Sequence, residues 1–177
     1  MIAALAGLQP TEVQAAGEVL LDGFSRPLLV LHAVTGMTAT FATTHHAVYS
    51  WLSARGPRRA GPLRRFGWIA PLAVGVQVLL GLLLYPAYRV HVRSAHLDHE
   101  APLVVQLFDF KEHLAALALV LVVGAALAGR LPPPAEAAEA SKVAGATAAL
   151  SITGAALVWM VALIGLYVTS VRPVGMP

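Results

Sequence analysis

Long apolar runs divide this chain into four segments, which cover residues 27–52, 66–86, 103–129 and 146–171. Each segment is long enough to cross a bilayer, because a membrane-spanning helix needs about 20 predominantly apolar residues. The runs are rich in leucine and alanine and show no alternation of period two, which argues against strands. Because the connections are short, successive helices must run antiparallel. The pattern predicts an all-α fold, an integral membrane four-helix up-and-down bundle over residues 25–177.

Composition supports this membrane location. Of the 177 residues, 58% are hydrophobic and only 12% are charged, and the mean hydropathy is +0.72, unlike the usual soluble mixture. The chain has no cysteine, so covalent c-type haem, cysteine-ligated iron–sulfur clusters and disulfides are excluded. A redox centre in this chain would need histidine or oxygen ligands.

Positive charge is concentrated between the first two apolar segments, in Arg55, Arg58, Arg59, Arg64 and Arg65. The positive-inside rule places this loop in the cytoplasm, and both termini and the polar connection 88–101 outside. We therefore expect a multi-pass protein of the bacterial inner membrane. Residues 1–24 lack a basic start and do not indicate a cleaved signal peptide. They form an outer-face segment in this prediction, either a short amphipathic helix or a partly ordered tail.

Histidines inside apolar segments are the first candidates for function, because a polar side chain in lipid is costly unless something binds it. His32 and His113 are in this position, and each belongs to a pair separated by fourteen residues, with His46 and His99 respectively. This spacing returns each pair to nearly the same helical face. The face of His32 is small or polar throughout and includes Thr35, Gly36, Ala39, Thr43, His46 and Ser50. Such a face allows close approach of another helix or of a flat macrocycle.

The face of His113 is polar in its first half and apolar in its second, with Gln106, Asp109, Ala116, Val120 and Gly124 near it. Asp109 precedes His113 by one turn and is a candidate to orient the imidazole or to receive a proton. Lys111 and Glu112 either belong to a site or snorkel to the outer headgroups.

Depth favours a b-type haem held between His32 and His113. Both histidines lie in the outer part of their helices, which run parallel in an up-and-down bundle. Arg89 and Arg93 are on the same side, where a guanidinium group can pair with a haem propionate.

A competing arrangement pairs His32 with His99 and His46 with His113, and holds two stacked haems. These four positions resemble the cytochrome b of bc-type quinol complexes, in which two parallel helices each carry histidines at this separation. The resemblance implies two haems. This arrangement requires Asp109 and the acidic residues beside His99 to lie closer to the membrane interior, which is unfavourable. More broadly, the chain resembles the small four-helix membrane b-type cytochromes that anchor or partner redox enzymes.

Two further histidine groups have alternative interpretations. His45 and His46 are either interfacial polar residues or contacts of a quinone headgroup. His91, His96 and His99 form either a zinc or copper site or an exposed polar connection, because their spacing matches no tetrahedral signature.

The sequence therefore predicts a membrane cytochrome b subunit that relays electrons between the quinone pool and a redox partner on the outer face. Bis-histidine ligation leaves no open iron position, so the chain is expected to work inside a larger oxidoreductase and to catalyse nothing alone. One alternative is a haem-free membrane subunit or assembly factor. Another is a proton or metal-ion transporter that uses His32, Asp109 and His113 as a relay. No sequence feature indicates a nucleic-acid partner.

Overall fold

The computed structural model describes residues 19–56, 60–132 and 134–172, and over these residues the chain is all-helical, without strands. Its elements are the 3-10 turn η1 (Asp22–Phe24), α2 (Ser25–Ala54), α3 (Ala60–Tyr88), the π-helix η2 (Arg89–Leu97), α4 (Asp98–Glu100), α5 (Pro102–Ala128) and α6 (Ala137–Val171). The predicted amphipathic helix near the N-terminus falls largely in residues 1–18, outside the described part of the chain.

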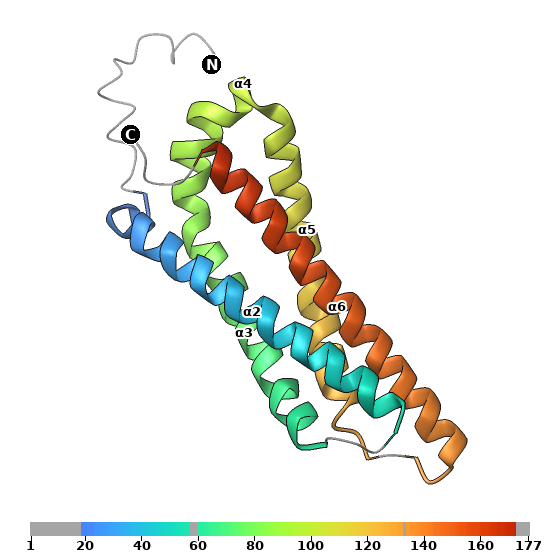
Figure 1. Cartoon of the computed structure of the whole chain (residues 1–177). Helices are drawn as coiled ribbons and strands as arrows, with labels where there is room; N and C mark the ends of the chain where they lie inside the picture. The colour runs from blue at the N-terminus through green and yellow to red at the C-terminus, as the bar shows by residue number, and fades with distance from the viewer. Residues whose placement is uncertain (1–18, 57–59, 133, 173–177) are drawn as a thin grey trace, which may run out of the picture.

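The four long helices lie side by side, and consecutive ones run in opposite directions (Figure 1). Helix α2 packs on α3 and α6, and α5 packs on α6 and α3, so α2 and α5 stand at opposite corners. We call the end that holds η2 and α4 the η2 end. We call the other the basic end, because Arg55, Arg64, Arg65, Arg130 and Lys142 belong to its helix ends and connections.

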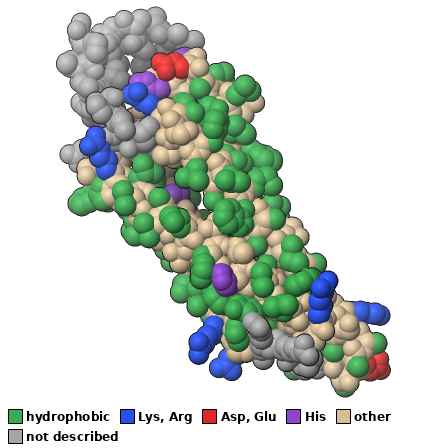
Figure 2. Space-filling model, viewed as in Figure 1, with side chains coloured by type: hydrophobic (Ala, Val, Ile, Leu, Met, Phe, Trp, Pro, Cys, Tyr) green, Lys and Arg blue, Asp and Glu red, His purple; other side chains and the backbone are tan. Residues whose placement is uncertain are grey.

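Three of the helices are long and apolar enough to cross a membrane: the continuous helix Gly61–Glu100, and Pro102–Ala128 and Ala137–Val171. Helix α2 has 30 residues but is not among the three, because histidine and threonine side chains interrupt its apolar run. Figure 2 shows hydrophobic side chains along the middle of one face, with charged groups gathered at the two ends. This distribution is compatible with a multi-pass membrane protein that contacts a lipid bilayer.

The polar segment 88–101, expected as a connection, instead continues the helix of α3 through η2 and α4. Its residues are polar but helix-compatible, with no proline or glycine between Pro86 and Ala101. The helix ends at Ala101, which adopts an extended-side conformation (φ −145°) before Pro102, as expected for a residue that precedes proline. Helix α6 likewise begins at Ala137, nine residues before the apolar run that predicted it.

The interior is layered along the bundle. At the η2 end, Tyr88, Val92 and Leu97 are buried with residues of α5 and α6. The centre is apolar and receives residues from all four long helices; this apolar layer consists of Ala39, Ala42, Ala70, Val74, Ala118, Val122 and Val158. Closer to the basic end, polar side chains are buried among alanines, and this His46 layer consists of Thr43, His46, Ser50, Thr147 and Ser151.

Candidate functional site

The candidate site forms at the contact between α2 and α3, where each histidine of the fourteen-residue pair lies against a glycine. A Cβ at Gly81 would lie 3.4 Å from Cε1 of His32, and one at Gly67 would lie 3.7 Å from Nε2 of His46. Gly67 and Gly81 are themselves fourteen residues apart, so the two antiparallel helices keep one register along this contact. The glycines leave room for the imidazole rings.

His32 is held by a chain of hydrogen bonds that crosses from α2 to α3 and back. Gln77 Nε2 donates to Nε2 of His32 at 3.0 Å, and the hydroxyl of Thr35 donates to Oε1 of Gln77. In neutral His32 this arrangement leaves the proton on Nδ1, and Nδ1 is buried without a hydrogen-bond partner among the described residues. A buried polar atom without a partner is costly, so His32 has an unused hydrogen-bonding position inside the bundle.

Lys111 is a second ionisable side chain among the long helices, and it extends from α5 toward α6. A Cβ at Gly165 of α6 would lie 3.9 Å from Lys111 Nζ, and Nζ lies 4.8 Å from the ring centroid of Phe108. Within the described residues Lys111 forms no salt bridge. We define the His32 layer as His32, Thr35, Gln77 and Lys111; it lies between the η2 end and the apolar layer.

Above the His32 layer, an ion pair joins the η2 helix to α5. Arg93 donates to both carboxylate oxygens of Asp109, at 2.8 Å and 3.2 Å, and its Nε lies 3.5 Å from Asp98. Arg93 is thus occupied by acidic side chains of the chain itself. Beside this pair, Tyr88 stacks on Phe108 with ring centroids 4.0 Å apart, and its buried hydroxyl has no hydrogen-bond partner among the described residues.

The His46 layer is separate from the His32 layer. His46 is only 3% exposed and faces Gly67, while Ser151 donates to Ser50 at 3.0 Å beside it. The layer is closed toward the basic end by Arg130, which donates to the carbonyl of Gly67 at 2.7 Å. The apolar layer lies between the two polar layers, and Thr40, whose hydroxyl donates to the carbonyls of Gly36 and Met37 in its own helix, is the buried polar side chain of α2 at this level.

His113 faces away from the interior. Residues two apart on a helix project about 200° from each other, so the inward position of Lys111 turns His113 to the outside of α5, where it is exposed. The Nδ1–H of His113 donates to the backbone carbonyl of Asp109 at 2.7 Å, which leaves Nε2 directed outward. The structure therefore does not bring His113 together with His32, whose ring lies against α3.

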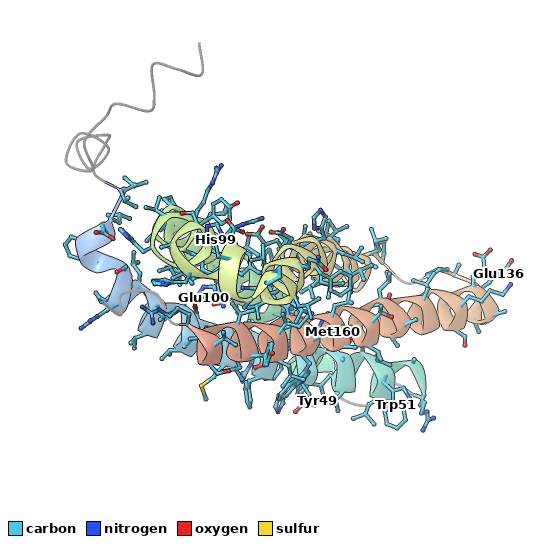
Figure 3. All side chains as sticks on the ribbon, turned by 90° about the horizontal axis from the view of Figure 1, so that it is seen from above. Tyr49, Trp51, His99, Glu100, Glu136 and Met160 are labelled. Atoms are coloured by element: carbon cyan, nitrogen blue, oxygen red, sulfur yellow. The ribbon has the colours of Figure 1, made fainter. Side chains whose placement is uncertain are left out.

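The second predicted arrangement is not assembled either. His99 is exposed in α4, and Figure 3 places it beside Glu100, toward the end of the molecule opposite Tyr49 and Trp51. His46 is buried against Gly67 rather than next to His113. Among the described residues, no group of three or more histidine, aspartate or glutamate side chains is arranged to hold a metal ion. His91 instead contacts Asp22, with Nε2 2.9 Å from the carboxylate.

The remaining predicted site residues have structural surroundings of their own. A Cβ at Gly36 would lie 3.0 Å from Nε2 of Gln77, whereas one at Gly124 would meet nothing within 4 Å. The hydroxyl of Thr43 donates to the carbonyl of Ala39 at 2.8 Å. Arg89 is exposed at the first position of η2.

Sequence reasoning missed two contributors. Gln77 is not among the predicted site residues, although a lone amide in an apolar helix is itself a signal of a polar partner. The pair Gly67 and Gly81 repeats the spacing of His32 and His46 on the next helix, and this match indicates an antiparallel contact between the two pairs.

No protein-family model, curated protein or solved structure matches this chain. The candidate site is therefore defined by its own geometry.

Proposed function

We propose that this chain is a multi-pass membrane protein whose His32 layer exchanges protons with the outer face. The observation that carries the proposal is a pair of ionisable side chains that pack between the helices, His32 of α2 against Gly81 of α3 and Lys111 of α5 against Gly165 of α6. Ionisable groups inside a membrane bundle are unfavourable unless they are used, and they mark ion and proton pathways.

In this proposal α2, α3, α5 and α6 all cross the bilayer. Helix α2 crosses with its polar stripe against α3, so that Gln77 and Gly81 rather than lipid cover His32. The positive-inside rule places the basic end in the cytoplasm and the η2 end outside, with both termini outside. This topology fits the inner membrane of a bacterium.

The available groups suit short-range proton exchange. The unused Nδ1 of His32 and the ammonium of Lys111 can each bind an ordered water, because buried waters bridge polar groups that lack protein partners. Gln77 fixes the ring and its tautomer. The apolar layer limits this exchange to one side, so the site takes up protons from the outer face and does not form a channel.

Transport across a membrane requires a site that opens to each side in turn. Four helices alone do not supply the two gates that this needs. We therefore propose that this chain acts within a larger membrane assembly, in which a partner uses the proton exchanged at His32. Such a partner would bind the outer part of the bundle or its lipid-facing surface.

Site-resolved nitrogen-15 NMR of histidine-labelled protein in proteoliposomes tests this proposal. We expect the His32 imidazole to change protonation when the external pH is varied at constant internal pH. The His32→Asn variant assigns the signal, and Lys111→Met should change the pH at which it moves. A His32 signal that ignores pH, or that follows the internal pH, would refute the proposal.

A second candidate, a b-type cytochrome subunit that relays electrons, is favoured by the geometry of His113. Its Nδ1–H is held by the carbonyl of Asp109, which is how a metal-binding histidine is commonly oriented, and Nε2 points outward. The described residues do not place two imidazoles face to face, so a haem at His113 would take its second ligand from a second copy of this chain. When bound, haem would supply one-electron transfer.

A reduced-minus-oxidised visible spectrum of protein expressed with added haem tests this second candidate. It predicts a b-type α-band that His113→Ala abolishes and His32→Ala preserves. A colourless protein would exclude the cytochrome function while leaving the proton-exchange proposal intact.

A further inference from the structure

A surface hollow of about 440 Å³ opens at the η2 end of the molecule, where α3 continues into the π-helix. Its lining residues are Tyr85, Arg89, Arg93, Ser94 and Asp98. The hollow is separate from the His32 layer and contains none of its residues.

The two arginines of the hollow are in different electrostatic situations. Arg93 is paired with Asp109 and lies near Asp98, so the one carboxylate of the lining is already matched by a cation. Arg89 is exposed and has no salt bridge among the described residues. The hollow therefore presents one uncompensated guanidinium group, which offers paired N–H donors suited to a phosphate.

The π-helix explains why these side chains converge. Hydrogen bonding from i to i+5 widens each turn, so residues four and five apart share a face, as Arg89, Arg93 and Ser94 do. Tyr85 belongs to the preceding turn, and its ring stacks on Phe108 with centroids 6.4 Å apart. This contact holds the Tyr85 ring against α5. Single π-helical turns are rare and recur at functional sites.

In the four-helix crossing proposed above, on which this step rests, the hollow lies at the phosphate level of the membrane. A hydrocarbon core of about 30 Å accommodates about 20 helical residues, which in α3 extends from Phe66, next to the basic end, to Tyr85. Arg89 lies one turn beyond this boundary, where lipid phosphates are found.

We propose that the hollow binds a phosphate group through the guanidinium of Arg89, with the hydroxyl of Tyr85 as a second donor. The group is either the phosphodiester of an anionic phospholipid headgroup or a free phosphate. The Arg93–Asp109 pair positions the wall of the hollow and does not contact the ligand.

Lipid-dependent stability in nanodiscs tests the proposal with the whole chain. The unfolding temperature is measured in phosphatidylcholine alone, in phosphatidylcholine with phosphatidylglycerol, and in phosphatidylcholine with inorganic phosphate. We expect phosphatidylglycerol to raise it in the wild type. Arg89→Gln should remove most of the rise, and Tyr85→Phe should remove a smaller part. The matched control is Arg26→Gln, because Arg26 is an arginine at the outer end of α2 that does not line the hollow. This variant should retain the full rise in unfolding temperature.

Native mass spectrometry gives a second measurement. Arg89→Gln should weaken the apparent affinity for phosphatidylglycerol by about tenfold, the equivalent of one charge-assisted hydrogen bond. If inorganic phosphate stabilises the wild type and not Arg89→Gln, the site binds free phosphate. The proposal is overturned if Arg89→Gln responds to both ligands as the wild type does. It is also overturned if Arg26→Gln loses as much of the phosphatidylglycerol-dependent stabilisation as Arg89→Gln does.

Discussion

The amide of Gln77 links two helices at a point where lipid offers no substitute for a hydrogen bond. It satisfies His32 Nε2 with one end and the Thr35 hydroxyl with the other. Because His32 Nδ1 is already without a partner, Gln77 is the one side chain that offsets the cost of burying this imidazole among the described residues.

Replacing Gln77 by leucine should therefore destabilise the protein by about 1–3 kcal/mol, the cost of a buried polar atom that loses its partner. The measurement is equilibrium unfolding in mixed micelles. The His32→Leu, Gln77→Leu double variant should be more stable than the sum of the single changes predicts, with a coupling energy of about 0.6 kcal/mol, as is typical inside membranes. Strict additivity of the two substitutions would show that the pair does not interact.

Two glycines provide a matched comparison in the same assay. Gly36→Ala should destabilise the bundle, because the new Cβ would lie 3.0 Å from Gln77 Nε2 and would displace the amide from His32. Gly124→Ala should be neutral or stabilising by up to about 1 kcal/mol, since alanine has the better helix propensity and its Cβ would meet nothing within 4 Å. Equal effects of the two substitutions would contradict this geometry.

Between helices, the ion pair of Arg93 with Asp109 links η2 to α5. The bidentate contact of Arg93 with Asp109 is shorter than its contact with Asp98, 2.8 Å against 3.5 Å. The Arg93 side chain is 26% exposed and that of Asp109 is 43% exposed. The pair therefore meets solvent or headgroups and contributes less than a buried ion pair would.

Asp109→Asn should lower the free energy of unfolding by less than about 1 kcal/mol, as for a partly exposed pair. The loss should diminish in high salt, because screening weakens the pair in the wild type. Asp98→Asn is the control and should cost less. A loss that is independent of salt would mean that lipid or a partner covers the pair.

Local sequence signals predicted the helices well and the polar contacts poorly. The predicted segments 27–52 and 103–129 match α2 and α5 to within two residues at each end. For α5 the reason is an apolar run of bilayer length, whereas the run of α2 is interrupted by histidine and threonine side chains. The extension of α3 through η2 was not predictable from hydropathy, since polar residues such as Arg89 and His99 can be helical outside lipid. The outward orientation of His113 depends on the inward orientation of Lys111. The packing of α5 on α6 beside Gly165 determines that orientation.

For the whole molecule, the proposed four crossings predict a definite pattern of accessibility. The chain has no cysteine, so single cysteines can be placed without background. In intact spheroplasts, Gly23→Cys and Ser94→Cys should react with a membrane-impermeant maleimide. Arg55→Cys and Ser141→Cys should react only after permeabilisation. Labelling of Gly23→Cys and Arg55→Cys from the same side would show that α2 does not cross the bilayer.

The central apolar layer also determines how the molecule would respond to voltage. Moving one elementary charge through the whole membrane field corresponds to about 2.3 kcal/mol per 100 mV. A potential falls mainly across the region of low dielectric constant, which in the proposed topology is the apolar centre that includes Ala39, Val74, Ala118 and Val122. Protons that reach His32 from the outer side do not cross that centre. Occupancy of the site should therefore follow external acidity closely and membrane potential only weakly.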